Sequence, residues 1–104
     1  MLDSCLTPDL VVEITLQPVR RHGVDAAIFF SDIVIPLKLA GVDVDIQPGV
    51  GPVLAHPVRT TEAADKLSLI SPEAFAPITE SVTRLVQELG QTPLIGFGGA
   101  PFTL

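Results

Sequence analysis

Two short segments of the chain are continuously apolar and are typical of buried strands. Residues 25–30 (DAAIFF) and 93–97 (PLIGF) show no alternation between polar and apolar positions. A strand in a parallel sheet is covered on both faces and therefore carries such an uninterrupted run. We expect a strand buried on both faces at each of these places.

Residues 42–47 (VDVDIQ) show the opposite pattern, because apolar and polar side chains alternate strictly. Such alternation predicts a strand with one buried and one solvated face. Residues 48–51 (PGVG) form a turn signal, and residues 52–54 can return as the partner strand. We expect a β-hairpin here, followed by a short helix over residues 62–67.

A first long helix has signals at both of its ends. Thr7 is expected to cap the free N–H groups, and Pro8 suits the first helical position. The helix is expected to run to about Arg21, with a kink at Pro18 and a stop at Gly23.

A second long helix is predicted to begin at Ser71, which acts as its cap, and to end at Gly90. Pro77 falls inside this segment and is expected to bend its early turns. Apolar residues recur at spacings of three and four and form one stripe. The stripe consists of Phe75, Ile78, Val82, Leu85, Val86 and Leu89.

The order of these elements indicates an α/β fold. Two buried strands joined through an amphipathic helix form a parallel βαβ unit, and residues 100–101 are expected to begin a further helix. One such unit leaves both strands without outer neighbours, and a typical (β/α)₈ barrel needs about 250 residues. We therefore expect residues 1–104 to be an incomplete piece of a single barrel domain. This partial (β/α)₈ TIM barrel would hold the first βαβ unit with a β-hairpin excursion.

Composition narrows the function classes. The chain of 104 residues is 47% hydrophobic and 17% charged, which is too apolar for a disordered segment. Its net charge of −6, without a basic run, argues against nucleic-acid binding. Neither a membrane-spanning run nor a signal peptide is visible. The single Cys5 suits a reducing cytosol and has no activating neighbour, so we expect an unreactive thiol in a cytoplasmic protein.

Asp32 is the main candidate for chemistry, because it follows the first predicted strand. In barrels and open α/β sheets, functional residues lie at the carboxyl ends of the strands. A carboxylate between apolar residues 29–30 and 33–35 is costly unless a partner pairs with it. Asp32 is either a structural residue that caps a turn, or a group that accepts ligand N–H bonds or stabilises a developing positive charge.

Residues 96–101 (GFGGAP) follow the second predicted strand. They lack the dinucleotide-binding fingerprint, because Pro101 stands where a glycine is required, and no P-loop Lys-Ser/Thr pair follows. The small residues allow either tight packing or the approach of a ligand to the backbone. His22 and His56 have no partners at metal-ligand spacing, so no metal site is predicted.

Three segments together resemble the uroporphyrinogen decarboxylase family: TLQPVRR at 15–21, DAAIFFSDI at 25–33 and PLIGFGGAPFTL at 93–104. The resemblance extends over essentially all of this chain, which corresponds to the part of such an enzyme with the first two barrel strands. The family usually has alanine where Gly98 stands. Its arginine-rich segment, which grips substrate carboxylates, and its later tyrosine and histidine positions lie outside this chain.

The resemblance implies decarboxylation of the four acetate side chains of uroporphyrinogen III to give coproporphyrinogen III, in porphyrin and heme biosynthesis. It implies no metal and no organic cofactor. Asp32 would be the catalytic and substrate-binding carboxylate, which accepts pyrrole N–H hydrogen bonds and stabilises the protonated pyrrole. Phe97 would line the substrate pocket. The full-length enzyme would be a cytoplasmic homodimer.

Two other hypotheses remain open from the sequence. One is a zinc-dependent corrinoid methyltransferase of the same superfamily, whose metal ligands would lie after this segment. The other is a non-catalytic, truncated remnant. Sequence beyond either end of the chain distinguishes them, and by itself the fragment is expected to be inactive.

Overall fold

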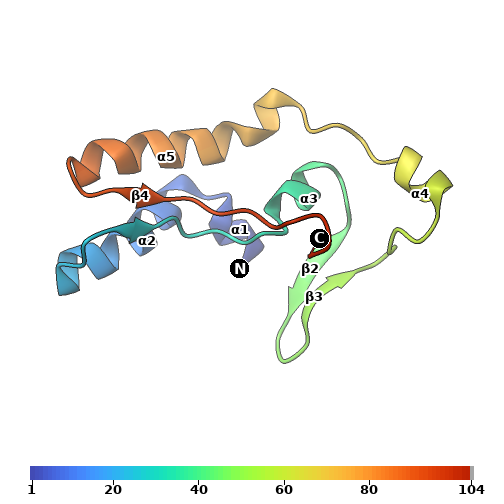
Figure 1. The fold of residues 1–104 in the computed structure, drawn as a ribbon, viewed down its shortest axis with the longest axis horizontal. Coiled ribbons are helices and arrows are strands. Elements are labelled where there is room, and N and C mark those ends of the chain that lie inside the picture. Colours follow the sequence, from blue (N-terminus) through green and yellow to red (C-terminus); the bar gives the residue numbers. More distant parts are fainter. Residues whose placement is uncertain (104) are drawn as a thin grey trace.

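The computed structural model describes residues 1–103. A short parallel sheet lies beside the two long helices, in the left half of Figure 1. β1 (Ala27–Ile28) pairs in parallel with β4 (Leu94–Ile95). The Phe29 N–H donates to the carbonyl of Ile95 at 2.9 Å, which extends the pairing past β1. The predicted parallel arrangement of the two apolar segments is confirmed.

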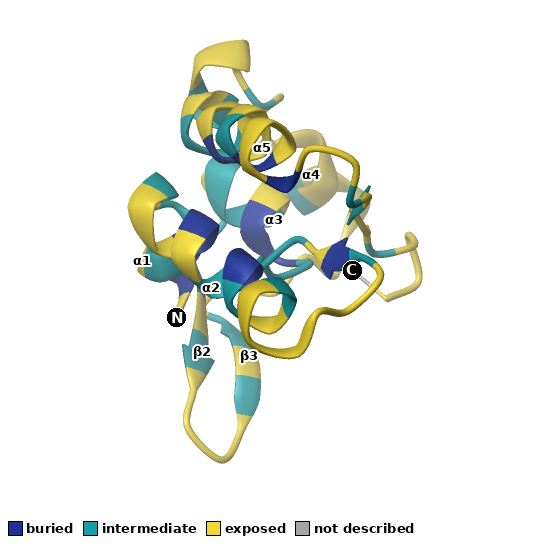
Figure 2. Ribbon diagram, turned by 90° about the vertical axis from the view of Figure 1, so that its left-hand side faces the viewer, coloured by how far each residue is buried: buried dark blue, intermediate teal, exposed yellow. Residues whose placement is uncertain are grey.

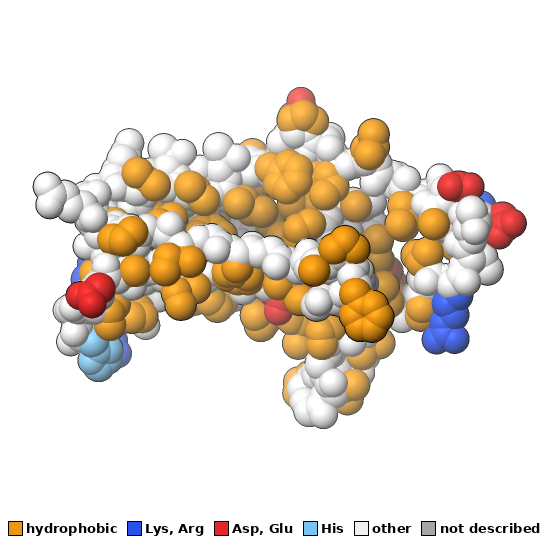
Figure 3. Space-filling view, viewed as in Figure 1, with side chains coloured by type: hydrophobic (Ala, Val, Ile, Leu, Met, Phe, Trp, Pro, Cys, Tyr) orange, Lys and Arg blue, Asp and Glu red, His pale blue; other side chains and the backbone are white. Residues whose placement is uncertain are grey.

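The expectation that both strands are buried on both faces is wrong for this chain. Ala27 is buried, but Ile28 is 65% exposed and its cross-strand partner Ile95 is 48% exposed. The reason is that helices cover one face of the sheet, and no described element covers the other. Hydrophobic side chains therefore gather on the open face of the strands (Figure 3).

α2 (Pro8–His22) and α5 (Ala76–Leu89) lie side by side and are the helices that cover the buried face of the sheet, opposite the open face. Their facing sides are the dark-blue, buried parts of the two helices in Figure 2. No described helix is long and apolar enough to cross a membrane. The core between these helices and the strands comprises Val11, Val12, Leu16, Ala27, Leu85 and Leu89.

α2 has the predicted extent, but its beginning differs from the prediction. Gly23 ends the helix in the left-handed region, with φ of 60°, as expected. Thr7 precedes the helix, yet its hydroxyl donates to the carbonyl of Asp3 at 2.8 Å instead of capping the N–H groups. An unpredicted helix, α1 (Leu2–Cys5), places that carbonyl within reach.

The second long helix begins in two steps. Residues Pro72–Phe75 form a 3₁₀ turn, η1, and α5 starts only at Ala76. Pro77 therefore lies in the first turn of α5, where a backbone N–H has no partner within the helix, so proline fits there without cost. The prediction of one uniform helix from Ser71 with Pro77 in its interior is wrong, and Ser71 makes no side-chain cap hydrogen bond.

The predicted hairpin is confirmed, with β2 (Val44–Gln47) antiparallel to β3 (Gly51–Leu54). A short helix, α3 (Ile35–Leu39), precedes it, and α4 (Thr61–Asp65) follows it close to the predicted place. α1, α3 and β2 meet in a second buried cluster. It comprises Leu2, Cys5, Val34, Ile35 and Val44.

The helix predicted to begin at residues 100–101 is absent from the described residues. Residues 101–103 form a turn, in which the Thr103 N–H donates to the carbonyl of Ala100 at 3.0 Å. Leu104 lies outside the described residues.

We predict that the isolated chain self-associates with rising concentration, because the open sheet face and its unpaired strand edges are exposed. Replacing Ile28 and Ile95 together by threonine is expected to weaken this association, since threonine keeps the β-branched shape but is polar. Val50→Thr, at the exposed hairpin tip, is the matched control. Sedimentation velocity over a concentration series is the measurement, and a monodisperse monomer throughout would contradict the prediction.

Candidate functional site

Asp32 lies in the loop between β1 and α3, beyond the carboxyl end of the strand. Its Oδ1 accepts a hydrogen bond from the Val34 N–H at 2.9 Å, and its carbonyl accepts one from the Ile35 N–H at 3.1 Å. These two bonds close the turn that leads into α3. Among the hydrogen bonds of residues 1–103, none uses Oδ2 of Asp32, so that oxygen is left to accept a further donor.

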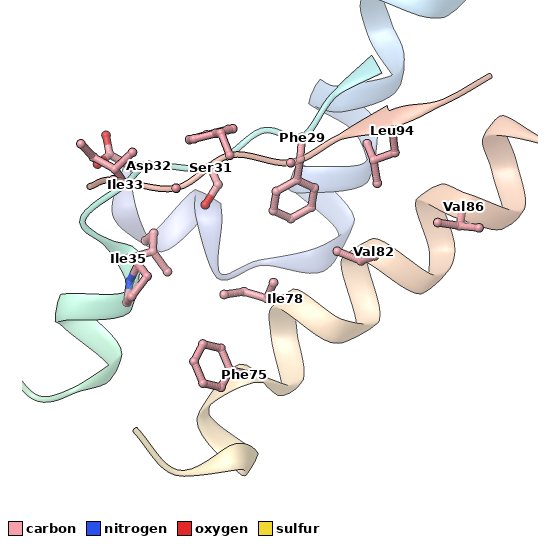
Figure 4. A pocket seen from close by; sticks show the side chains of 15 residues that line it. Phe29, Ser31, Asp32, Ile33, Ile35, Phe75, Ile78, Val82, Val86 and Leu94 are labelled. Atoms are coloured by element: carbon pink, nitrogen blue, oxygen red, sulfur yellow. The ribbon is translucent and has the colours of Figure 1, made fainter. Parts of the chain in front are cut away.

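A cleft of about 540 Å³ opens between the strands and helix α5 and reaches the Asp32 loop. Figure 4 shows Phe29 and Leu94 pointing from the strands toward Ile78 and Val82 on the helix. Apart from Ser31 and Asp32, the side chains around this cleft are apolar. Its lining comprises Phe29, Ser31, Asp32, Ile33, Ile35, Pro36, Phe75, Ile78, Val82, Val86, Leu94, Gly96, Phe97, Gly98 and Gly99.

The carboxylate of Asp32 lies at one end of this cleft and is turned away from Ile78 and Val82 (Figure 4). The side chain is half-buried, so part of its surface meets water. A carboxylate beside an apolar wall can bind the N–H group of a flat, apolar ligand and can stabilise positive charge on it. Both predicted interpretations of Asp32 are thus compatible with this geometry: one oxygen holds the turn and the other is available.

The structure brings both predicted site segments to the same cleft. Phe97 follows β4, lines the cleft, and is 52% exposed. A Cβ atom built on Gly96 or on Gly98 would meet nothing within 4 Å. Tight packing within the described residues therefore does not explain these two glycines, and the backbone there is open to a ligand or another segment.

Cys5 lies beneath the Asp32 loop in the second buried cluster, and it is only 1% exposed. Burial, and then the negative charge of Asp32, raise the pKa of the Cys5 thiol. A thiol with a raised pKa is a poor nucleophile, so the expectation of an unreactive cysteine is supported.

The other candidate residues stay apart from the cleft. His22 is exposed at the end of α2, and His56 is exposed beyond the hairpin. Asp43 and Asp45 lie on the solvated side of the hairpin, as predicted. Within residues 1–103, no group of three or more His, Cys, Asp or Glu residues could hold a metal ion.

None of the described residues that line the cleft carries a positive charge. Instead, three basic residues form ion pairs elsewhere. Arg84 Nη1 lies 2.7 Å from Asp9 Oδ1, and Lys38 Nζ lies 3.4 Å from Asp3 Oδ1. Arg20 lies 3.5 Å from Glu88 and 3.8 Å from Glu13. These residues tie helices together and are not arranged to bind an anionic ligand at the cleft.

The sequence did not assign the α5 wall to the site. The apolar stripe of α5 divides, so that Leu85 and Leu89 enter the core while Val82 and Val86 face the cleft. The sequence signal for this second role was the width of the apolar stripe, which is broader than a helix needs to pack against a single neighbouring element.

Comparisons with known proteins agree with the resemblance seen in the sequence. A family model described as "Uroporphyrinogen decarboxylase (URO-D)" matches residues 1–104. Proteins named uroporphyrinogen decarboxylase from Arthrobacter sp. and Nocardioides sp. are 71% and 69% identical to this chain over 104 residues. A third with that name, from Streptomyces coelicolor, is 64% identical. The alignments cover 100% of this chain but only 29–30% of each relative.

A solved structure shows the same fold. A methyltransferase from Methanosarcina mazei superposes with a TM-score of 0.72 over 97% of this chain and 32% of that protein. The identity is 14%, so the likeness concerns the fold alone. It supports a mixed α/β arrangement that recurs as a part of a longer chain.

The closeness of Cys5 to Asp32 generates a testable pH dependence. We predict that Cys5 ionises at higher pH than a free cysteine, and that Asp32→Asn lowers this pKa by removing a neighbouring negative charge. The chain has neither tyrosine nor tryptophan, so thiolate absorbance in the ultraviolet can be followed without overlap. Asp25→Asn, at the exposed start of the β1 segment, is the matched control. Identical titrations of both variants would contradict the predicted closeness.

The same shift predicts how stability depends on pH. The folded chain holds the Cys5 proton more tightly than the unfolded chain, since its pKa is raised on folding. This contribution to stability is fully present below the unfolded pKa and is lost as pH rises through the folded pKa. Urea unfolding at a series of alkaline pH values, compared with Cys5→Ser, measures it, and equal pH dependence of the two proteins would refute it.

Proposed function

The chain belongs to the uroporphyrinogen decarboxylase family, and on that premise we propose that it is the part of such a decarboxylase that carries the central carboxylate, Asp32. The substrate would be uroporphyrinogen III, and the product coproporphyrinogen III. The observation that carries the proposal is the meeting of Asp32 and the segment 96–99 at one largely apolar cleft, within segments that match the family.

The proposed reaction needs a place for the electrons of a breaking C–C bond. A pyrrole ring that is protonated on carbon is a cation and accepts the electron pair released as an acetate arm loses carbon dioxide. A proton then adds to the exocyclic carbon to form a methyl group, and loss of the proton first added to the ring carbon restores the neutral pyrrole, so that one proton is consumed for each carbon dioxide released. Asp32 would accept ring N–H hydrogen bonds through its available oxygen and stabilise the ring cation. This chemistry requires neither a metal nor an organic cofactor.

We also propose that residues 1–104 form an incomplete piece of one (β/α)₈ barrel domain. The open face of β1 and β4 would point to the barrel interior, and their free edges would pair with further strands. Phe97, on the segment that follows β4, would contact substrate at the carboxyl ends of the strands, where the cleft reaches Asp32.

The remaining requirements of the substrate fall on chain outside this segment. Uroporphyrinogen is a polyanion, whereas this chain has a net charge of −6 and no basic residue at the cleft. Arginines elsewhere in the enzyme would therefore bind the carboxylate arms. We propose a cytoplasmic homodimer for the whole enzyme, in keeping with the family resemblance and with a single unpaired cysteine.

A hybrid protein tests this function directly. Replacing the matching segment of the Arthrobacter relative, which is 71% identical, by this chain supplies the missing parts of an enzyme. We expect the hybrid to convert uroporphyrinogen to coproporphyrinogen at a rate within about tenfold of the unmodified relative. A folded hybrid without activity would contradict the proposal, and it would favour the interpretation of this chain as a non-catalytic remnant.

Within that hybrid, Asp32→Asn is expected to lower kcat by about a hundred- to a thousandfold, the loss typical of removing one preorganised electrostatic group. The asparagine carbonyl can still accept the Val34 N–H bond, so the melting temperature is expected to stay within a few degrees. Asp45→Asn is the matched control, because Asp45 also accepts a neighbouring N–H bond, from Ile46 at 2.8 Å, but lies on the hairpin. Near-normal turnover of Asp32→Asn would leave Asp32 as a turn residue only.

A further inference from the structure

We propose that Thr15 of α2 is a positioning residue for Asp32, an inference that rests on the proposed function of Asp32. The Thr15 hydroxyl oxygen accepts a hydrogen bond from the Phe30 N–H at 3.0 Å. Phe30 lies two residues before Asp32, at the point where the chain leaves the sheet. The bond therefore links a long helix to the segment that carries the carboxylate.

The position of this bond in the segment gives it its importance. The Phe29 N–H still pairs with β4, through the carbonyl of Ile95. The Phe30 N–H points the other way, toward α2. Among the hydrogen bonds of residues 1–103, this is the last one that ties the segment to another element before Asp32. Without it, the last such hydrogen bond before Asp32 would be the one from the Phe29 N–H to Ile95, one residue earlier.

Thr15 is buried among apolar side chains, and packing alone does not explain why this position carries a hydroxyl group. Thr15 is 3% exposed on the face of α2 that otherwise presents Val11, Val12 and Leu16 to the core. A valine has the same shape and would suit such a face without a buried polar atom. The hydroxyl instead provides the acceptor that a half-buried N–H of Phe30 needs.

Asp32 is thus held from both sides. Before it, Thr15 anchors the backbone at Phe30 to α2. After it, Val34 and Ile35 pack in the second buried cluster with Cys5, and the Asp32 turn is closed onto Val34. A carboxylate that must meet a ring N–H at hydrogen-bond distance loses its effect when it moves by about 1 Å, which costs on the order of a hundredfold in rate.

The test uses the hybrid enzyme with three single variants. Thr15→Val removes the acceptor and is expected to lower kcat about ten- to a hundredfold with little change in KM, because Asp32 acts mainly on the charged transition state. Thr15→Ser keeps the hydroxyl and is expected to restore most of the activity. Ser81→Ala removes another buried hydroxyl, which bonds only to the carbonyl of Pro77 on its own helix at 2.8 Å, and is the control.

A double-variant comparison separates positioning from general damage. If Thr15 acts through Asp32, Thr15→Val is expected to change kcat less than about threefold when Asp32 is already asparagine, because residues in one network are not additive. If the loss in kcat of the double variant equals the product of the two single losses, the proposal is overturned. Equal losses in Thr15→Val and Thr15→Ser would also overturn it. If Thr15→Val fails to fold, Thr15→Ala removes the same acceptor without crowding and takes its place in both comparisons.

The outcomes also distinguish this proposal from the function it rests on. An inactive Asp32→Asn hybrid together with a fully active Thr15→Val hybrid would refute the positioning role and leave the decarboxylase assignment intact. A fully active Asp32→Asn hybrid would refute the assigned role of Asp32. Amide hydrogen exchange at Phe30, faster in Thr15→Val than in Thr15→Ser, provides a readout that does not depend on activity.

Discussion

The packing of α2 against α5 beneath the two short strands is the contact on which the candidate site depends. β1 and β4 pair over only two residues each and are separated by most of the chain, so their ladder is too small to hold them together. Fully burying a side chain such as Leu85 contributes about 1.5–3 kcal/mol. An exposed ion pair such as Arg84–Asp9 contributes far less, because water screens its charges. The apolar core between α2, α5 and the strands therefore holds β1 and β4 in the pairing that brings Asp32 and Gly98 to one cleft.

Under the proposed function, a structural and a chemical role share one side chain, that of Asp32. A carboxylate has two oxygens with several acceptor positions. Oδ1 closes the turn onto Val34, and this bond fixes the side chain without using its whole capacity. A group that must stabilise charge in a reaction gains from being fixed in advance, since it then needs no reorganisation as the charge forms. The turn bond can thus be part of the function.

The sequence pattern predicted the elements whose apolar faces are covered within the chain. α2, the hairpin and the part of α5 from Ala76 to Leu89 match, because their periodicity and their Gly and Pro boundaries are local. The prediction of fully buried strands was wrong at Ile28, because nothing among the described residues covers that face. α1 and α3 were not predicted, because helices of about one turn carry little periodic signal and neither has a side-chain cap at its start, unlike α4, where the Thr60 hydroxyl accepts the Ala63 N–H.

The candidate site was also predictable only in part: the residues at the strand ends were predicted, and the contacts that hold them were not. The rule that parallel strands place functional residues at their carboxyl ends singled out Asp32, and residues 96–101 were placed after the second predicted strand; the structure brings Asp32 and residues 96–99 to one cleft. Two residues that lie against the segment of Asp32 were not predicted to do so. Thr15 accepts the Phe30 N–H, and Cys5 lies close to Asp32 itself. Both contacts join residues far apart in sequence, and one threonine in an apolar helix face gives no sign of its partner.

The distribution of charge separates two tasks that a decarboxylase of a polyanion must perform. Binding the carboxylate arms requires cations, whereas stabilising a ring cation requires an anion nearby. In this chain Arg20, Lys38 and Arg84 are each engaged with acidic residues, and the cleft contains one carboxylate beside apolar walls. Cations placed next to Asp32 would weaken its effect on the ring, because opposite charges at short range offset each other. Under the proposed function, arm-binding cations on other segments would leave the field of Asp32 at the reacting ring undiminished.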